Sequence, residues 1–434
     1  MVKPDSIALF DSTYATAQDD ADKLAGYRDK FAFPVSPRGG RCTYLCGNSL
    51  GLMPRHVADV VQQELEDWAT LGVAAHFDAT VPWFSYHEVF RETGALLVGA
   101  RPGEVVMMNS LTVNLHLMMA SFYRPSGTRF RILMEESAFP SDRYAVASHV
   151  QWRGYDPTEA VVVATPAEGD ALTIADFERV FSEAGDSLAL VLLGGVNFFT
   201  GQLYDLQKIC EMGHSAGCIV GYDLAHAAGN VPLALHEWGV DFAVWCSYKY
   251  LNAGPGAVGG CFVHERYGQD KSIPRLAGWW GNEPATRFQM TPDFQPRAGA
   301  EGWQLSNPPI LSMAPLRVSL EMFNGAGMRA LREKSIRLTG YLASLLGALE
   351  FAGVHVTTPG DPAARGCQLS IRLPVGSADV VDALSDRGIV VDYRPPDIVR
   401  VAPVPLYNSF NDVLRFVTTL ADLLNVDLNG ATPR

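Results

Sequence analysis

The sequence predicts an α/β protein with a large domain built on a mostly parallel sheet and a smaller α+β domain. Three observations predict this class. Short apolar runs alternate with helical stretches between about residues 104 and 264. Each run is apolar throughout, which is typical of strands buried on both faces of a parallel sheet covered by helices. Beyond residue 312, helical segments alternate with a few shorter strand-like runs, which indicates a separate, smaller unit.

The first half of the chain contributes two helices and then seven strands. Residues 14–30 and 55–70 are predicted as helices, the second because Val57, Val60, Val61, Leu65 and Trp68 recur at helical spacing. The apolar runs predict strands within 104–109, 129–135, 159–165, 187–196, 217–223, 242–247 and 259–264.

The last third is expected to form the small unit. Residues 269–312 are rich in Pro, Gly, Trp and Asn, and long loops of this kind are more often functional than idle. Helices are then expected at 313–323 and 328–350, strands within 367–373, 389–394 and 399–404, and further helices between and after these strands. We therefore expect an N-terminal arm, residues 1–45, to join residues 313–434 in a small domain, with residues 46–312 forming the large α/β domain.

Composition and charge exclude several partner classes. The chain has 434 residues, of which 48% are hydrophobic and 19% are charged, so it can bury a large core without disulfide staples. It carries 34 Lys and Arg against 47 Asp and Glu, a net charge of −13, and no basic cluster stands out. Nucleic acid and anionic membranes are therefore poor partners, and an anionic substrate would need a local basic pocket.

The cysteines and the N-terminus indicate a cytoplasmic protein. There are 7 cysteines, an odd number, and most lie in apolar strings, as buried reduced thiols do. Cys42 and Cys46 lack a second pair or a nearby His to complete a zinc set, so no metal site is expected. The N-terminus lacks the apolar region of a signal peptide, and no apolar run approaches the roughly 20 residues that span a bilayer.

Two short motifs match known chemistry but lack its context. Gly47-Asn48-Ser49-Leu50-Gly51 is a G-x-S-x-G sequence, yet a serine nucleophile elbow needs a helix directly after the serine, and Pro54 delays one. Gly254-Pro255-Gly256-Ala257-Val258-Gly259 is a G-x-G-x-x-G sequence, but it runs into a predicted strand where a dinucleotide site needs a helix. It is better explained as a glycine-rich turn passing close to a bulky group.

The segment 221–251 has a more specific pattern. One predicted strand ends in Asp223, and a later one is followed by Ser247-Tyr248-Lys249, with His226 between them. A Lys among apolar and aromatic residues is either an edge residue or a nucleophile that loses its proton readily. Pyridoxal phosphate needs a Lys for a Schiff base and a carboxylate that keeps its ring nitrogen protonated. Asp223 and Lys249 have this chemistry at the carboxyl ends of strands, where ligands of open α/β sheets bind.

The wider sequence resembles the kynureninase family over most of its length. The resemblance rests on LCGNSLGL at 45–52, NSLTVNLHLMM at 109–119, FPSD at 139–142, YDLAHAAGN at 222–230, WCSYKYLNAG at 245–254, GWWGN at 278–282, SNPPIL at 306–311 and RVAPVPLYNS at 400–409. It implies the pyridoxal phosphate-dependent fold type I, with a large domain and a small one. It also implies hydrolysis of L-kynurenine to anthranilate and L-alanine in tryptophan catabolism, with 3-hydroxy-L-kynurenine as an open alternative substrate.

The resemblance also implies roles for single residues. Lys249 would carry the cofactor, Asp223 would face its ring nitrogen, and Phe139 would stack on its ring. The other implied cofactor contacts are Leu111, Thr112, Pro140, Ser141, Asp142, Gly194, His226, Tyr248, Trp279 and Asn307, with Leu111 and Thr112 at the positive end of a helix and His226, Tyr248 and Trp279 donating to the phosphate. Tyr248 is also a candidate proton donor. Trp279 and Asn307 would come from the partner subunit of a homodimer.

The resemblance implies fewer residues for substrate binding than for cofactor binding. Arg400 would bind the α-carboxylate of the substrate, because its two parallel donors match a carboxylate. Ser49, His76 and Asn307 would contact the aryl ketone end. The chain departs from the family pattern at Gly194, where a Ser is common, at Phe198-Phe199, where a Tyr pair is common, and at Pro255. None of these departures removes a reactive group.

Three other functions compete with this interpretation. A cysteine desulfurase or selenocysteine lyase needs a nucleophilic Cys on a mobile loop, whereas Cys367 lies in a strand-like run. A non-catalytic effector-binding domain would be fused to a basic DNA-binding module, and residues 1–45 are too short and acidic for one. A serine hydrolase would rest on Ser49 alone and would lack the absorption band of a cofactor.

Overall fold

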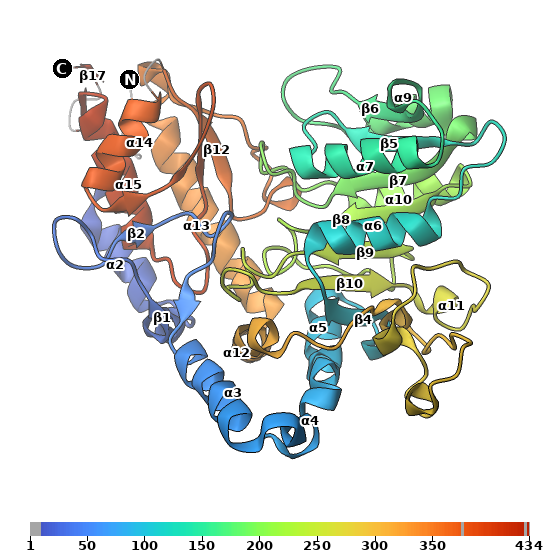
Figure 1. Cartoon of the computed structure of the whole chain (residues 1–434). Coiled ribbons are helices and arrows are strands. Elements are labelled where there is room, and N and C mark those ends of the chain that lie inside the picture. Colours follow the sequence, from blue (N-terminus) through green and yellow to red (C-terminus); the bar gives the residue numbers. More distant parts are fainter. Residues whose placement is uncertain (1–9, 375–376, 429–431, 434) are drawn as a thin grey trace. The chain divides into compact units, whose positions relative to one another are not determined.

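A computed structural model describes residues 10–374, 377–428 and 432–433 (Figure 1). By its internal contacts the chain divides into two compact units. Unit 1 comprises residues 1–55, 199–203 and 326–434, and unit 2 comprises residues 56–198 and 204–325. Unit 1 therefore combines the N-terminal arm with the C-terminal region, and its borders lie near the residues 45 and 312 expected from the sequence.

Unit 2 contains the seven strands predicted from the apolar runs, in one sheet of order β4-β10-β9-β8-β7-β5-β6. Strands β6, β5, β7, β8 and β9 run parallel to one another, whereas β10 is antiparallel to both β9 and β4. The sheet is thus mostly parallel, with one reversed strand. The strands are β4 (Val105–Met108), β5 (Arg131–Glu135), β6 (Val161–Ala164), β7 (Leu188–Gly194), β8 (Ile219–Asp223), β9 (Phe242–Trp245) and β10 (Gly259–Val263).

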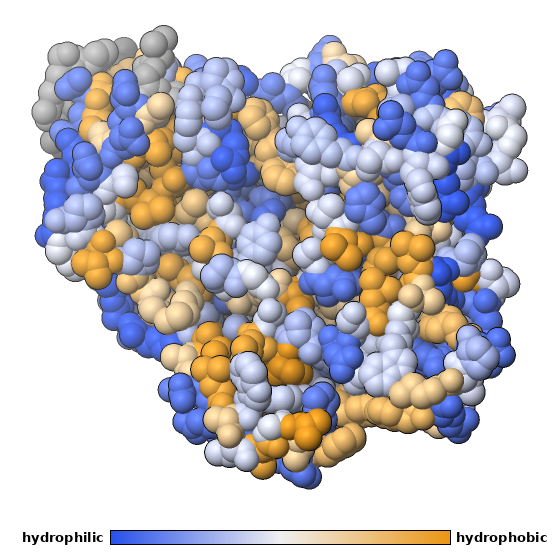
Figure 2. All heavy atoms as spheres, viewed as in Figure 1, coloured by the Kyte–Doolittle hydropathy of each residue, from blue (hydrophilic) through white to orange (hydrophobic). Residues whose placement is uncertain are grey.

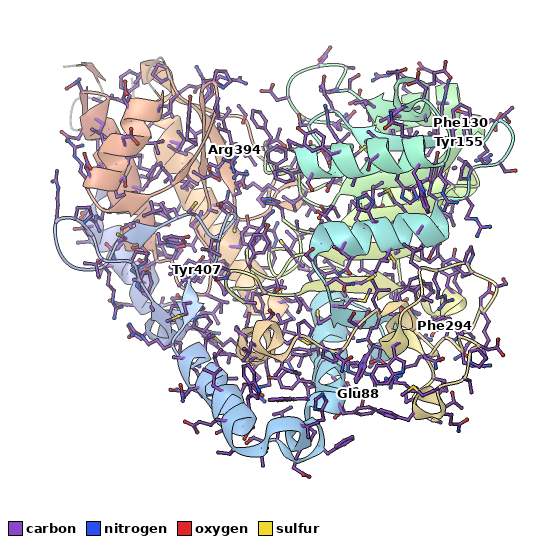
Figure 3. All side chains as sticks on the ribbon, viewed as in Figure 1. Glu88, Phe130, Tyr155, Phe294, Arg394 and Tyr407 are labelled. Carbon is purple, nitrogen blue, oxygen red and sulfur yellow. The ribbon has the colours of Figure 1, made fainter. Side chains whose placement is uncertain are left out.

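Helices bury the faces of this sheet. Helices α6 (Leu111–Phe122) and α7 (Pro140–Trp152) lie side by side in front of the strands in Figure 1. Their apolar side chains form a core with residues such as Ile132, Leu190 and Phe242, all inaccessible to solvent. Just before β5 the ring of Phe130 stacks on Tyr155 with centroids 4.9 Å apart; Figure 3 labels both residues. Strands β4, β9 and β10 are buried along their whole length, in agreement with their uniformly apolar sequences.

The remaining helices of unit 2 flank the sheet. Helices α9 and α10 pack on β6 and β8, and α5 packs on β4. Residues 269–312 contain only short 3-10 helices before α12 begins, so the long ordered loops expected there are present. The helices are α3 (Val57–Leu71), α4 (Ala75–Asp78), α5 (Arg91–Val98), α8 (Pro157–Ala160), α9 (Ile174–Ala184), α10 (Leu206–Ser215), α11 (Glu265–Gly268) and α12 (Ile310–Ala326), with 3-10 helices η3 (Gly72–Ala74), η4 (Trp83–Phe90), η5 (Pro102–Glu104), η6 (Gly185–Ser187), η7 (Trp279–Gly281), η8 (Arg287–Gln289) and η9 (Ala300–Trp303).

Unit 1 is built on a four-stranded antiparallel sheet of order β11-β12-β15-β14. Its core gathers residues distant in sequence, among them Leu45, Leu342, Ile371 and Phe416. A parallel pair, β2 (Thr43–Tyr44) with β13 (Ile389–Val390), joins the N-terminal arm to the C-terminal region. The other elements are α2 (Ser12–Asp20), η2 (Ala25–Lys30), β1 (Phe31–Ala32), β3 (Met53–Pro54), α13 (Met328–Gly347), η10 (Glu350–Ala352), β11 (His355–Val356), η11 (Pro362–Ala364), β12 (Leu369–Arg372), α14 (Ser377–Asp386), β14 (Asp392–Arg394), β15 (Ile398–Val401), α15 (Phe410–Leu423), β16 (Val426–Asp427) and β17 (Thr432–Pro433).

One predicted helix was wrong in extent. Residues 14–30 do not form one helix: α2 ends at Asp20, and a separate 3-10 helix covers Ala25–Lys30. The break has a local cause, because the carboxylate of Asp22 accepts a hydrogen bond from the backbone N–H of Leu24 at 2.9 Å and so favours a turn.

Among the described residues, no helix has both the length and the apolarity required to cross a membrane.

Candidate active site

A cavity opens in unit 2 where the parallel strands end. The last residues of β5, β7 and β8, namely Glu135, Gly194 and Asp223, all face it. The N-terminal turns of α6 and α7 and the segment after β9 complete its wall. This is the position at which open α/β sheets bind ligands. The lining residues are Leu111, Thr112, Glu135, Phe139, Ser141, Asp142, Gly194, Val196, Phe198, Asp223, Ala225, His226, Tyr248 and Lys249.

Lys249 reaches into this cavity from the segment that follows β9. Its Nζ lies 2.9 Å from Nε2 of His226 and 5.7 Å from the centre of the Phe139 ring. The backbone turns sharply after it, because Ala253 N–H donates to the carbonyl of Ser247 at 3.0 Å. This turn fixes the lysine at the end of the strand. The structure thus places His226 beside the amine of Lys249.

Asp223 and Asp142 form a buried carboxyl pair. Each is 7% exposed, and the two carboxyls act on each other strongly enough that sharing one proton is favoured over two negative charges. The N–H of Ala225 donates to Oδ1 of Asp223 at 2.7 Å and fixes its orientation. Burial raises the pKa of both carboxyls, while Lys249 opposes this rise. The pair therefore presents one negative charge to the cavity.

Glu135 is a third buried carboxyl that the sequence analysis missed. It is 3% exposed, and its Oε1 accepts a hydrogen bond from the N–H of Gly194 at 3.1 Å. Burial, with a smaller contribution from Asp223, raises the pKa of Glu135 to about 7. The signal was present, because Glu135 closes an apolar run just as Asp223 does. Val196, Phe198 and Ala225 also line the cavity and had not been assigned to it.

The N-terminus of α6 provides donors for an anion. Ser110 precedes the helix in an extended conformation, and its side chain caps no N–H group. The first N–H groups, at Leu111 and Thr112, therefore lie at the positive end of the helix without a side-chain acceptor. A Cβ added at Gly259 would lie 3.2 Å from the nitrogen of Leu111, so the glycine keeps this approach clear. The hydroxyl of Thr112 lies 3.0 Å from that of Ser141.

Aromatic rings border the cavity. The ring of Phe139 is 43% exposed and packs edge-on against Phe198, with centroids 5.1 Å apart. It therefore offers a face to a flat ligand. Tyr248 lies on the same wall, and burial raises the pKa of its hydroxyl, which therefore keeps its proton at neutral pH.

Several residues predicted for the site do not line this cavity. Pro140 is the first residue of α7, and Trp279 and Asn307 lie in the loop region and are exposed. His76 also lies in unit 2, where its Nδ1 is 3.0 Å from the carbonyl of Val73 and its ring packs against Trp83. The other ten predicted cofactor contacts all line the cavity: Leu111, Thr112, Phe139, Ser141, Asp142, Gly194, Asp223, His226, Tyr248 and Lys249.

Ser49 and Arg400 belong to unit 1. Ser49 lies in a turn after Cys46, and a short strand rather than a helix follows it at Met53, so the nucleophile elbow is not formed. Arg400 lies in β15, is 1% exposed and pairs with Asp392. Asp392 also accepts from Arg394, labelled in Figure 3, at 2.9 Å.

The fold and the site together define the class of protein to which the chain belongs. A lysine and a carboxylate at the ends of adjacent parallel strands, with a helix N-terminus open to an anion, are the features of fold type I pyridoxal phosphate enzymes. Solved structures agree with this fold. A C-DES mutant with glycine covalently linked to its PLP cofactor matches with a TM-score of 0.77 at 18% identity, over 91% of this chain and 99% of that one. The cysteine desulfurase CsdA from Escherichia coli matches at 0.76 and 20%, over 93% and 98%.

Sequence comparison then identifies the family. The kynureninase of Myxococcus xanthus is 57% identical over 94% of this chain and 96% of its own length. That of Koribacter versatilis is 53% identical over 96% and 99%. The model of the kynureninase C-terminal domain matches residues 331–420. The chain belongs to the kynureninase family, which confirms the resemblance found in the sequence.

Proposed function

We propose that this protein hydrolyses L-kynurenine to anthranilate and L-alanine with pyridoxal phosphate as cofactor. 3-Hydroxy-L-kynurenine is the alternative substrate, and its rate of hydrolysis is to be compared with that of L-kynurenine. The observation that carries the proposal is Lys249 in one cavity with the Asp142–Asp223 pair. The family membership of the chain and its near full-length identity to kynureninases support the substrate.

The residues present fit this cofactor. Lys249 would bind it covalently, Asp223 would hold a proton on its ring nitrogen and Phe139 would stack on its ring. The uncapped N–H groups of Leu111 and Thr112 would hold its phosphate. When bound, pyridoxal phosphate supplies an electron sink for the negative charge that develops at the α-carbon of the substrate.

The protein's own groups would then handle protons and charge. The amine of Lys249 takes the proton from the α-carbon, and His226, 2.9 Å away, orients that amine. The hydroxyl of Tyr248 keeps its proton and is available to donate it where negative charge develops on the ketone oxygen or the leaving carbon. Arg400 binds the α-carboxylate with two parallel N–H groups, and Ser49 and His76 contact the aryl ketone end.

We further propose that the protein acts as a homodimer whose partner subunit contributes Trp279 and Asn307. Both residues are exposed and lie outside the cavity of their own chain. Unit 2 also exposes Trp68 and Leu311, 61% and 44% accessible, in an apolar groove that is partly lined by the start of α12. Figure 2 shows hydrophobic residues gathered over α12. Apolar surface of this kind favours association between subunits.

The cytoplasm is the compartment that we propose for this activity. All seven cysteines carry free thiols, which fits a reducing environment. Six are buried, and burial raises the pKa of the partly exposed Cys46 to about 12, so its thiolate is rare at neutral pH.

A cysteine desulfurase activity is the alternative raised by the structural neighbours. It would need an accessible nucleophilic thiol. Cys367 lies in a bend just before β12 and is inaccessible to solvent. This placement disfavours desulfuration, and the direct comparison is release of alanine from cysteine against release from kynurenine.

The test of the function replaces Lys249 with Ala and measures anthranilate fluorescence during turnover of kynurenine. We expect complete loss of turnover and of the absorption band of covalently bound cofactor. Lys208→Ala is the matched control, because Lys208 is a half-exposed helix residue outside the cavity whose ammonium lies 3.7 Å from Glu211. Normal turnover by the Lys249→Ala protein would refute the proposed function. Steady-state rates with both substrates would establish the ring preference.

A further inference from the structure

Three buried carboxyls crowd one end of the cavity. Glu135, Asp142 and Asp223 are each at most 7% exposed, and their charges act on one another. Lys249 is the cation that opposes them in the cavity. Three ionised carboxylates facing one ammonium would leave two unbalanced negative charges out of contact with water, which is very unfavourable. Protons must therefore be held within this cluster.

One proton is assigned to Asp142 and Asp223 together, because burial and the charge of Asp223 both raise the pKa of Asp142, and two adjacent buried carboxylates are unfavourable when both are ionised. The surroundings of Glu135 decide where a second proton is held. Its Oε1 accepts the N–H of Gly194, and its Oε2 has no hydrogen-bond partner among the described residues. A carboxylate at this place would leave Oε2 without a donor among the described residues.

Asp241 shows what this fold provides for a buried carboxylate that stays ionised. It is 1% exposed, yet its oxygens accept from the N–H of Val220 at 2.6 Å and the hydroxyl of Tyr267 at 2.6 Å, and it pairs with Arg266 and His214. These donors lower its pKa although burial raises it. Glu135 accepts from the N–H of Gly194 and is attracted by the exposed Arg143, but burial outweighs these contributions and its pKa rises.

We propose that Glu135 is a positioning residue that carries a proton in the working site, so that the cluster presents one negative charge, shared by Asp142 and Asp223, to the bound cofactor. The groups facing Glu135 from the surrounding elements are Gly194 N–H, Asp142, Asp223, Lys249, the neutral hydroxyl of Tyr204 and the exposed Arg143. The proton on Glu135 keeps a second negative charge away from Lys249, whose amine must lose a proton to act as a base. This consequence for catalysis rests on the proposed function, whereas the proton itself does not.

The sign of the pH dependence follows from linkage. Burial raises the pKa of Glu135 from its ordinary value of 4.5 to about 7, so between these values the folded protein holds a proton that the unfolded chain has released. The stability contributed by that proton is present in full below the lower value and is lost as the pH rises through the higher one. A Gln at this position cannot titrate and keeps an oxygen for Gly194 N–H.

The experiment compares the holoenzyme with its Glu135→Gln and Glu136→Gln variants. Glu136 is the adjacent, exposed residue and serves as the matched control. We expect the Tm of Glu135→Gln, relative to the parent, to rise by several degrees between about pH 5 and about pH 8. Glu136→Gln should follow the parent. The infrared C=O stretching band of a buried protonated carboxyl should weaken in Glu135→Gln and in no other sample.

Two outcomes would overturn the proposal: Tm curves that run parallel in the parent and in Glu135→Gln, or an unchanged infrared band. If Glu135→Gln does not fold, the parent alone remains decisive, because its infrared band must then weaken as the pH is raised through about 7. Neither readout depends on turnover. Failure of the proposed function, seen as an active Lys249→Ala protein, is therefore distinguishable from failure of this inference.

Discussion

Arg400 combines deep burial with a permanent positive charge. Its guanidinium pairs with Asp392 in the adjacent strand, and Arg394 supports the same carboxylate from 2.9 Å. Two cations around one carboxylate leave net positive charge in this part of unit 1. In a protein of net charge −13, recognition of a substrate carboxylate depends on such local groups rather than on the overall field.

We therefore expect Arg400→Ala to raise the KM for kynurenine by roughly 10- to 100-fold, the loss that corresponds to charged hydrogen bonds. Arg400→Lys keeps the charge beside Asp392 but loses the two parallel donors, so a smaller rise is expected. Steady-state kinetics would separate KM from kcat. Arg329→Ala is the control, because its side chain is 93% exposed. An unchanged KM in Arg400→Ala would exclude Arg400 from substrate binding.

At the residue scale, sequence reasoning succeeded where chemistry and position coincide. Asp223 and Lys249 each follow an apolar strand, and the fold brings them to one cavity. Glu135 gave the same signal but was passed over, because no established role directed attention to it. The contact between His226 and Lys249 depends on a turn between strands, and spacing alone does not encode it.

Replacing a glycine by alanine should change the free energy of unfolding in opposite directions at two positions, one at the end of a helix and one inside a helix. Gly99 ends α5 with φ of +62°, and a Cβ there would lie 2.2 Å from the carbonyl oxygen of Leu233. Gly99→Ala should lower the free energy of unfolding by about 1–2 kcal/mol from the left-handed backbone alone, and by more from the clash. Gly340 lies within α13 with no atom near such a Cβ, so Gly340→Ala should raise it by about 0.8–1 kcal/mol.

The free energies of unfolding of the two variants and the parent, measured by denaturant titration, test both predictions. Each serves as the control for the other, because the chemical change is identical. Equal shifts in one direction would contradict the assignment of these backbone conformations.

At the scale of elements, strand positions could be predicted and their directions could not. The seven apolar runs became the seven strands of one sheet. A uniformly apolar run carries no information about direction, so the antiparallel setting of β10 was invisible in Gly259–Val263. Likewise, the turn that ends α2 depends on one side chain, Asp22, which helical spacing does not reveal.

At the scale of the whole molecule, an active site that two subunits share can be tested by mixing inactive variants. A homodimer in which the partner supplies Asn307 should regain activity when inactive Lys249→Ala and Asn307→Ala chains are unfolded and refolded together. Mixed dimers then contain one complete site, which amounts to about a quarter of all sites after random mixing. If Asn307 acts within its own chain, no mixed dimer contains a complete site and activity stays at the level of the separate variants. Sedimentation of the parent would establish the dimer independently.

The pairing of β2 with β13 has a consequence for synthesis on the ribosome. Thr43 N–H donates to the carbonyl of Gly388 at 2.8 Å, so the N-terminal arm must wait for a segment made some 345 residues later. At roughly 5–20 residues per second, that delay is about 20–70 s. Unit 2 is complete in the nascent chain once residue 325 has emerged. Leu45 is buried in the core of unit 1 together with residues as late as Val426, so its native contacts are complete only after the last helix of the unit has been made.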